Sequence, residues 1–195
     1  MLWELIDAII LMLIVINPFS KMFYVASLRE EFTENEVKYV ISRSNIIGLL
    51  ILVIFAIFGS YILHDIFHIE VDALRVAGGI VLAKIGFDYL EKGAHFVIEK
   101  TRNILELSAV PVATPLIAGP AAITTVITVS AEHGLLIGCA ASSTAIIINT
   151  VLMYISVWIT EKIGKTTLSI LIRIIGLFIM AIGIQMILIG IRGFI

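Results

Sequence analysis

The chain has 195 residues, of which 60% are hydrophobic and 14% are charged, and its mean hydropathy is +1.11. Soluble domains average about 25% charged residues, so this composition excludes a soluble globular protein and indicates an integral membrane protein. The formal net charge of −2 and the absence of a basic run argue against nucleic-acid binding, and the single cysteine, Cys139, excludes an intrachain disulfide and a CxxC redox centre.

Six apolar segments are separated by charged patches, and each is long enough to cross a hydrocarbon core of about 30 Å as a helix. They cover, approximately, residues 4–28, 40–63, 72–91, 107–131, 134–159 and 169–192. A capping box of Thr33 and Glu36 predicts that the second helix begins near residue 34, outside the bilayer. We therefore expect an all-α membrane protein with six transmembrane helices.

Two of these segments contain a proline near the middle. Pro18 follows Asn17 in the first segment, and Pro120 follows Gly119 in the fourth. Because proline has no N–H and its ring crowds the preceding turn, we expect helices 1 and 4 to be broken near the bilayer midplane. Irregular backbone at that depth is tolerated only where protein buries it or where it lines a watery cavity, so the breaks predict a binding site. The structural alternative is a proline kink repaired by neighbouring helices.

The two prolines suggest that the chain is a repeat, with one half over residues 1–92, a cytoplasmic linker over residues 93–106 and a second half over residues 107–195. The segment LRVAGGIVLAKIG also aligns with IRIIGLFIMAIGI, which matches Gly78 with Gly176. Each half holds three spans, an odd number, so the two halves must face opposite ways. This predicts the inverted-topology repeat of many secondary transporters.

The positive charges predict the orientation. Lysines and arginines gather in the first, third and fifth loops, whereas the opposite face holds only Arg75 and Arg192, both at helix ends. The positive-inside rule places those three loops in the cytoplasm and both termini outside.

The motifs INPFSKMFYVASL and ATPLIAGPAAITTVI, together with the RVAGGI helix, resemble the MarC family of prokaryotic membrane proteins, which includes the SnatA neutral amino-acid transporters. The resemblance covers nearly the whole chain, and PLIAGPAAITTVI is its most specific part. It implies six spans, a plasma-membrane location and, for the SnatA branch, transport of small neutral amino acids such as glycine and alanine. Phe19, Ser20 and Lys21 depart from the NPIGNIP-like form that is usual in the family.

The ends of broken helices can bind a small zwitterion. In an inverted pair the two broken helices run antiparallel, so their ends offer N–H groups for a carboxylate and carbonyls for an ammonium. Small side chains would let the backbone approach a small substrate, although such residues also mediate plain helix packing. The expected substrate-binding residues are Asn17, Pro18, Phe19, Ser20, Lys21, Ala118, Gly119, Pro120, Ala121, Thr124 and Thr125.

Four further residues are candidates for coupling or gating: Lys84, Asp88, Asn149 and Gly78. Ionisable groups within spans are costly and mark functional sites by default, but Lys84 could instead snorkel to the interface and pair with Asp88. Asn149 either lines the path or bonds across a helix interface. Gly78 either permits close helix contact or serves as a hinge. We expect neither a metal site nor a cofactor.

The sequence thus predicts a secondary transporter of small neutral amino acids that works by alternating access, coupled to a proton or sodium gradient. An enzyme is not expected, because the chain has no P-loop, HExxH motif or GxSxG elbow. A passive channel and an exporter of another small solute remain as alternatives. The expected partners are the zwitterionic amino acid, the coupling ion and the lipid bilayer. Six short spans leave much lipid-facing surface, so a homo-oligomer is also possible.

Overall fold

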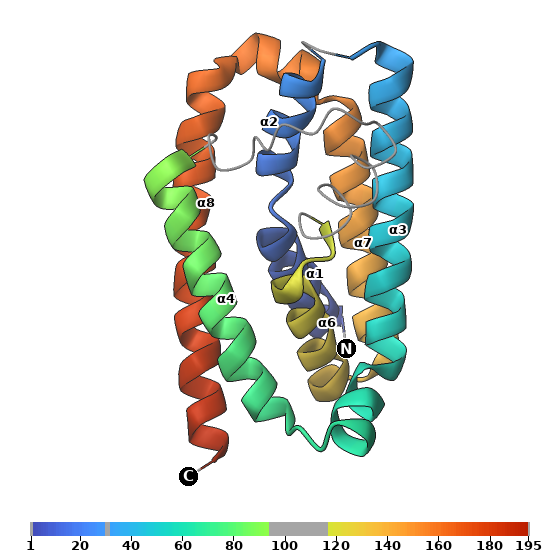
Figure 1. The fold of residues 1–195 in the computed structure, drawn as a ribbon, viewed down its shortest axis with the longest axis vertical. Helices are drawn as coiled ribbons and strands as arrows, with labels where there is room; N and C mark the ends of the chain where they lie inside the picture. The colour runs from blue at the N-terminus through green and yellow to red at the C-terminus, as the bar shows by residue number, and fades with distance from the viewer. Residues whose placement is uncertain (1, 30–31, 94–116, 195) are drawn as a thin grey trace.

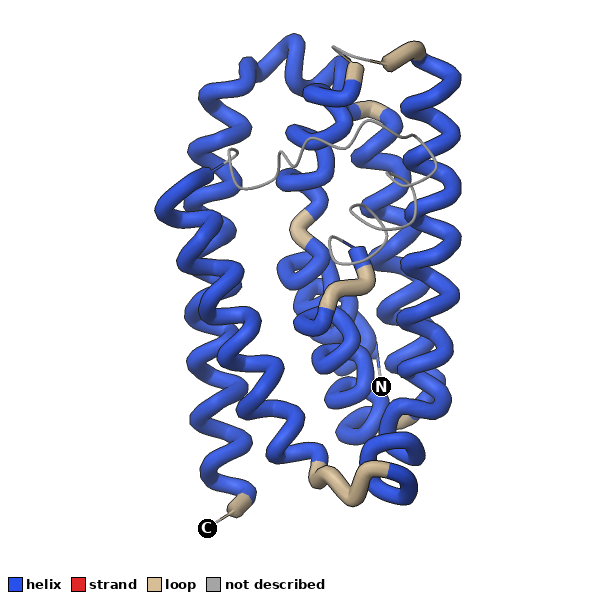
Figure 2. Tube along the Cα trace, viewed as in Figure 1, coloured by secondary structure: helices blue, strands red, loops and turns tan. Residues whose placement is uncertain are grey.

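The structure is a computed structural model that describes residues 2–29, 32–93 and 117–194. The described residues form seven α-helices and one short π-helical turn, with no strand among them (Figure 2). In chain order the elements are α1 (Leu2–Ile16), α2 (Pro18–Leu28), α3 (Glu34–Tyr61), the π turn η1 (Ile62–Ile66), α4 (Val71–Lys92), α6 (Pro120–His133), α7 (Leu135–Tyr154) and α8 (Ser156–Gly193). The predicted all-helical class is confirmed.

The helices form an elongated bundle in which the broken helices occupy the centre. Figure 1 shows α4 and α8 together along one side and α3 and α7 along the other, with α1, α2 and α6 between them. Contacts from α1 to α6 and α7, and from α2 to α8, join the central helices to both sides. The central position of these helices buries Asn17 and Pro18 at the first break and Ala118 and Gly119 before α6.

Four helical stretches in the described part of the chain are long and apolar enough to cross a membrane: Leu2–Ala26, Glu34–Ile66, Leu135–Tyr154 and Thr166–Gly193. They coincide with the first, second, fifth and sixth expected spans, and α4 occupies the third with 22 residues. The first half of the fourth span and nearly all of the expected linker, residues 94–116, lie outside the described residues. Large apolar side chains such as Leu136 and Ile147 are 84% and 61% exposed, as a lipid-facing surface requires.

Two boundaries illustrate how local sequence sets the helix ends. The predicted capping box is present at the start of α3, where the Thr33 N–H and hydroxyl both donate to Glu36 Oε2, at 2.8 and 2.7 Å. The fifth span ends at Tyr154, earlier than the expected residue 159, and a short helical piece from Ser156 then precedes Gly164, whose φ of 78° interrupts α8. Only glycine adopts that backbone region without a steric penalty.

Glycines bring α4 and α8 into backbone contact. A Cβ atom added at Gly79 would lie 2.5 Å from the carbonyl oxygen of Gly183, and one added at Gly86 would lie 2.6 Å from that of Gly176. Close approach through small residues is the usual way in which helices associate in membranes, where no hydrophobic effect drives them together. The α4–α8 pair therefore forms a tightly packed wall beside the central helices.

Candidate functional site

The first break has a backbone geometry that asparagine and proline both favour. Asn17 has a φ of 50°, in the left-handed region that asparagine tolerates better than most residues, and Pro18 begins α2 at the position where its missing N–H costs least. Asn17 Oδ1 accepts a hydrogen bond from the Ser20 N–H at 3.4 Å, and the Ser20 hydroxyl donates to the Asn17 carbonyl at 2.8 Å. Asn17 thus caps α2 as it ends α1.

Lys21 lies fully buried beside this break, with 1% of its surface exposed. Its ammonium donates to the carbonyl oxygen of Ile16, the last residue of α1. That carbonyl is free because the Ser20 N–H bonds to the Asn17 carbonyl, at 3.2 Å, instead of continuing the helix. A cation at a helix C-terminus is stabilised by the partial negative charge there. No salt bridge joins Lys21 to a carboxylate within the described ranges.

The second expected break falls at Gly119, the residue before α6, and the part of that span before residue 117 lies outside the described residues. Pro120 is the first residue of α6, and the first hydrogen bond of this helix runs from the Ile123 N–H to the Gly119 carbonyl, at 3.0 Å. The amides of Ala121 and Ala122 precede that bond, and no side chain among the described residues caps this end. The N-terminus of α6 therefore presents N–H groups and a partial positive charge.

The end of α1 and the start of α6 both lie in the central part of the bundle. Helices α1 and α6 contact each other and run in opposite directions, since Asp7 near the start of α1 lines the same cavity as His133 at the end of α6. The end of α1 and the start of α6 consequently point toward the central part of the bundle, where Figure 2 shows two loops. We call the residues at these ends, Asn17–Lys21 and Ala118–Thr125, the central site.

Most of the expected substrate-binding residues are buried in the central site. Ser20 and Ala118 have no exposed surface, and Phe19 is half-buried, whereas Pro120 is exposed. The buried residues are Asn17, Pro18, Ser20, Lys21, Ala118, Gly119, Ala121, Thr124 and Thr125. The Asn17 side-chain amide nitrogen has no hydrogen-bond partner in the described part of the chain. A buried amide without a partner is costly, so it provides a donor for a ligand.

Helix α4 supports the central site at two points. The Tyr89 hydroxyl donates to Ser20 Oγ at 3.3 Å, and Gly78 packs against Thr124 so closely that an added Cβ would lie 2.2 Å from Thr124 Cγ2. Gly78 therefore permits close contact between α4 and α6, the first of its two expected roles. Tyr89 was not predicted, because nothing in the sequence indicates that it faces Ser20.

Lys84 pairs with Asp88, as the structural alternative for these two residues predicts. The Lys84 ammonium lies 3.4 Å from Asp88, and Lys92 lies 3.1 Å from the same carboxylate. The Asp88 side chain is 10% exposed, whereas that of Lys84 is 76% exposed. These three residues follow one another along α4 at four-residue intervals, so the ion pairs are made within one helix.

Asn149 bonds across a helix interface, one of its two expected roles. Its amide nitrogen donates to Asn45 Oδ1 at 2.7 Å, which joins α7 to α3, and Met153 lies 3.3 Å from the same nitrogen. Asn149 Oδ1 is buried and has no partner among the residues described. Asn45 was not predicted as a partner of Asn149, because it follows several charged residues and is typical of the polar first turns of a membrane-spanning helix.

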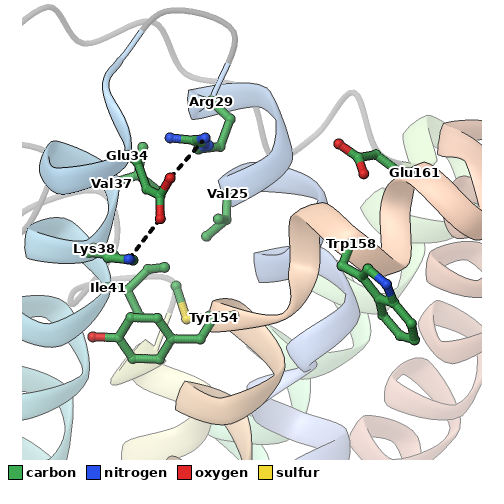
Figure 3. A pocket seen from close by; sticks show the side chains of 10 residues that line it. Val25, Arg29, Glu34, Val37, Lys38, Ile41, Tyr154, Trp158 and Glu161 are labelled. Carbon is green, nitrogen blue, oxygen red and sulfur yellow. Dashed lines mark ion pairs between the residues drawn. The ribbon is translucent and has the colours of Figure 1, made fainter.

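Two cavities lie toward opposite ends of the bundle. The first, of about 260 Å³, lies where α2 ends and α3 begins (Figure 3). Its wall includes an ion-pair chain in which Glu34 binds Lys38 at 2.7 Å and Arg29 at 3.7 Å. Trp158 and Glu161, from the start of α8, line it from the other side.

The second cavity, of about 270 Å³, lies among α1, α4, α6 and α8, at the end where the chain begins and finishes. It extends from Glu132 and His133 to Leu11 and to Thr125, which belongs to the central site. Arg75 of α4 forms ion pairs with Asp72 and with Glu132 of α6 at its wall. These acidic and basic residues were not predicted as site residues, because charges at helix ends are usual at a membrane boundary.

Residues 2–195 match the sequence model of a protein family that is described as MarC family integral membrane protein. The chain is 54% identical to a UPF0056 membrane protein of Pyrococcus horikoshii over 99% of this chain and 96% of the relative. It is also 34% identical to one of Methanocaldococcus jannaschii, over 92% and 91%, and 30% identical to the membrane protein YvbG of Bacillus subtilis, over 91% and 89%. The chain belongs to the MarC family.

Family membership confirms that this MarC protein is an integral membrane protein along its whole length. The names of these relatives describe membrane proteins and specify no substrate. No solved structure matches this MarC chain. Its function must therefore be inferred from the central site and the two cavities.

Proposed function

We propose that this MarC protein is a secondary transporter of small neutral amino acids, such as glycine and alanine, that works by alternating access. The observation that supports this best is that the break between α1 and α2 and the proline start of α6 both lie in the central helices of the bundle, with cavities toward its opposite ends. Discontinuous helices at mid-depth are typical substrate sites of secondary transporters. In the proposed orientation both termini lie outside the cell.

The packing supports the six-helix inverted repeat that this mechanism requires. Suppose that Gly79 of α4 is equivalent to Gly176 of α8, and Gly86 to Gly183. The equivalence then converts the contact of Gly79 with Gly183 into the contact of Gly176 with Gly86, which the structure also contains. Contacts that exchange in this way are expected around a two-fold axis between equivalent helices. The equivalence differs by one residue from the alignment of Gly78 with Gly176, and it is carried by a seven-residue glycine spacing in each helix.

The charges at the central site favour binding of a carboxylate. The N-terminus of α6 offers the amides of Ala121 and Ala122, Asn17 offers its unpartnered amide, and Lys21 adds an ammonium. No carboxylate of the described residues pairs with Lys21. The small side chains around α6 leave room for a small substrate. A neutral amino acid would present its carboxylate to these donors.

The burial of the centre favours a gated carrier over an open pore. Asn17, Lys21 and Ile117 are each 1% exposed, and Ala118 has no exposed surface. A passive channel needs a continuous opening, whereas a carrier passes through a state in which neither cavity reaches the substrate. The Arg75–Glu132 ion pair is suitably placed to hold α4 against α6 on one side of such a state.

The proposal is tested by uptake of labelled glycine and alanine into proteoliposomes, with and without a proton or sodium gradient. Wild type is compared with Gly119→Leu and with Ala131→Leu. Gly119 is buried with a φ of −73°, which any residue adopts, so leucine acts there by filling the site. Ala131 is exposed on the same helix and provides a matched control.

We expect concentrative uptake in wild type and Ala131→Leu, and its loss in Gly119→Leu. Glycinamide, which lacks the carboxylate, should compete with glycine at least tenfold less well than alanine does. Uptake that only equilibrates the solute would support the channel instead. If neither amino acid moved under any gradient, the proposed substrate would be wrong.

A further inference from the structure

The carbonyl end of α1 is already occupied by a positive charge from the protein itself. In an unbroken helix the Ile16 carbonyl would accept the Ser20 N–H, but the break directs that N–H to Asn17. The Lys21 ammonium takes the vacated place on the Ile16 oxygen. Because Lys21 follows Ile16 by little more than one helical turn, its side chain folds back along α2 to reach this oxygen.

Unwound carbonyls and half-helix C-termini are the groups that coordinate Na⁺ in many secondary transporters. A hard cation and a lysine ammonium both need oxygen acceptors and a negative potential. At the first break, the partial negative charge of the α1 C-terminus is the compensation that the described residues provide for the fully buried Lys21. One such helix end compensates about half an elementary charge, so a second cation there would be repelled.

We propose that Lys21 is a tethered cation that takes the place of a coupling Na⁺ at the C-terminal end of α1. The first break therefore binds no Na⁺ in the wild-type protein, and the central site works without it. Removal of the ammonium creates a vacancy that Na⁺ can fill. The consequence for ion binding stands on the Lys21–Ile16 contact alone, whereas the consequence for transport rests on the proposed function.

The direct test measures the thermal midpoint, Tm, of the full-length protein in detergent, in NaCl and in choline chloride at equal ionic strength. Wild type should show the same Tm in both salts. Lys21→Ala should gain about 2–4 °C in NaCl over choline chloride, which corresponds to a modest ligand-induced stabilisation for a chain of this size. Lys21→Arg keeps a tethered cation and should be insensitive to Na⁺, as should Lys162→Ala, which removes an exposed lysine of α8.

A Na⁺-specific rise in Tm of the wild type would overturn the proposal, and so would a folded Lys21→Ala that does not respond to Na⁺. If Lys21→Ala does not fold, uptake by wild type decides the question. Glycine uptake driven by a proton gradient should then change less than twofold when Na⁺ is replaced by choline, and a tenfold dependence on Na⁺ would refute the tethered cation. Absence of all uptake would count against the proposed function only, and the Tm of wild type and Lys21→Arg would still test the cation.

Discussion

Replacing Gly86 by alanine tests the contact between α4 and α8. In a free helix this change is stabilising by about 1 kcal/mol, because glycine has the greater conformational entropy to lose. In this fold the new Cβ would lie 2.4 Å from the Met180 backbone nitrogen and 2.6 Å from the Gly176 carbonyl oxygen. Both obstacles are backbone atoms, so no side chain can rotate away. We therefore expect the sign of the effect to reverse.

The size of the effect follows from the separation that the new methyl group requires. Ordinary contact begins at 3.4 Å, so the two helices must move apart by about 1 Å. A gap of that size forfeits a quarter to a half of the dispersion energy of the atom pairs involved, and overpacking of this kind costs about 1–3 kcal/mol. With the helix-propensity gain subtracted, we expect a net loss of up to about 2 kcal/mol, and a fall in Tm of about 2–4 °C for each kcal/mol.

The assay is thermal unfolding of the purified protein in detergent, with Phe87→Leu as the control. Phe87 is the next residue of α4 and is 52% exposed, so its substitution should change the free energy of unfolding by no more than about 0.5 kcal/mol. A Gly86→Ala protein with a raised Tm would show that α4 and α8 do not touch through their backbones at this position, and the reasoning would be refuted.

Substitutions at three further sites, Asn17, the Asn45–Asn149 pair and Arg75, test the centre and one end of the bundle. Asn17→Val should lower the free energy of unfolding by about 1–3 kcal/mol, because a β-branched residue is strained at a φ of 50°. Asn17→Gly should lower it by only a few tenths of a kcal/mol. Equal Tm values for the two variants would contradict the left-handed backbone at this position. Asn149→Ala should lower the free energy of unfolding by about 0.6–1.7 kcal/mol, because it leaves Asn45 Oδ1 without its donor. Replacing both asparagines by leucine should restore most of the lost Tm. A double variant with a lower Tm than the single variant would argue against the pair. Arg75→Gln should lower the free energy of unfolding by at most about 1 kcal/mol, since the Glu132 side chain is 42% exposed. The difference in Tm from wild type should become smaller in about 1 M salt. A difference that salt leaves unchanged would mean that Arg75 acts through packing.

The elements that could be predicted from the sequence are those with local causes. Proline without an N–H fixes the start of α2 and of α6, and the Thr33–Glu36 capping box fixes the start of α3. Each of these signals acts within one turn of the chain, so neighbouring residues suffice to recognise it. The length and polarity of the apolar segments similarly indicate the spans.

The features that could not be predicted depend on contacts between distant residues. The sequence indicates that Lys21 lies near a break, but not that its ammonium reaches back to Ile16, because that depends on the backbone path at Asn17. Similarly, the partner of Asn149 is chosen by the packing of α3 on α7. The sequence comparison aligned Gly78 with Gly176, and only the structure shows that Gly79 faces Gly183 and that Gly86 faces Gly176.

The two breaks differ in how their backbone groups are satisfied, and this difference indicates where a substrate can contribute most. At the first break Asn17 caps α2 and Lys21 caps α1, so local side chains satisfy the freed groups. At the second, Gly119 and the alanines that follow have no side chain able to cap α6. An unsatisfied N–H at membrane depth costs several kcal/mol. The described residues provide no side-chain cap at the start of α6, so a carboxylate placed there would remove that cost, and a ligand gains most at this helix end.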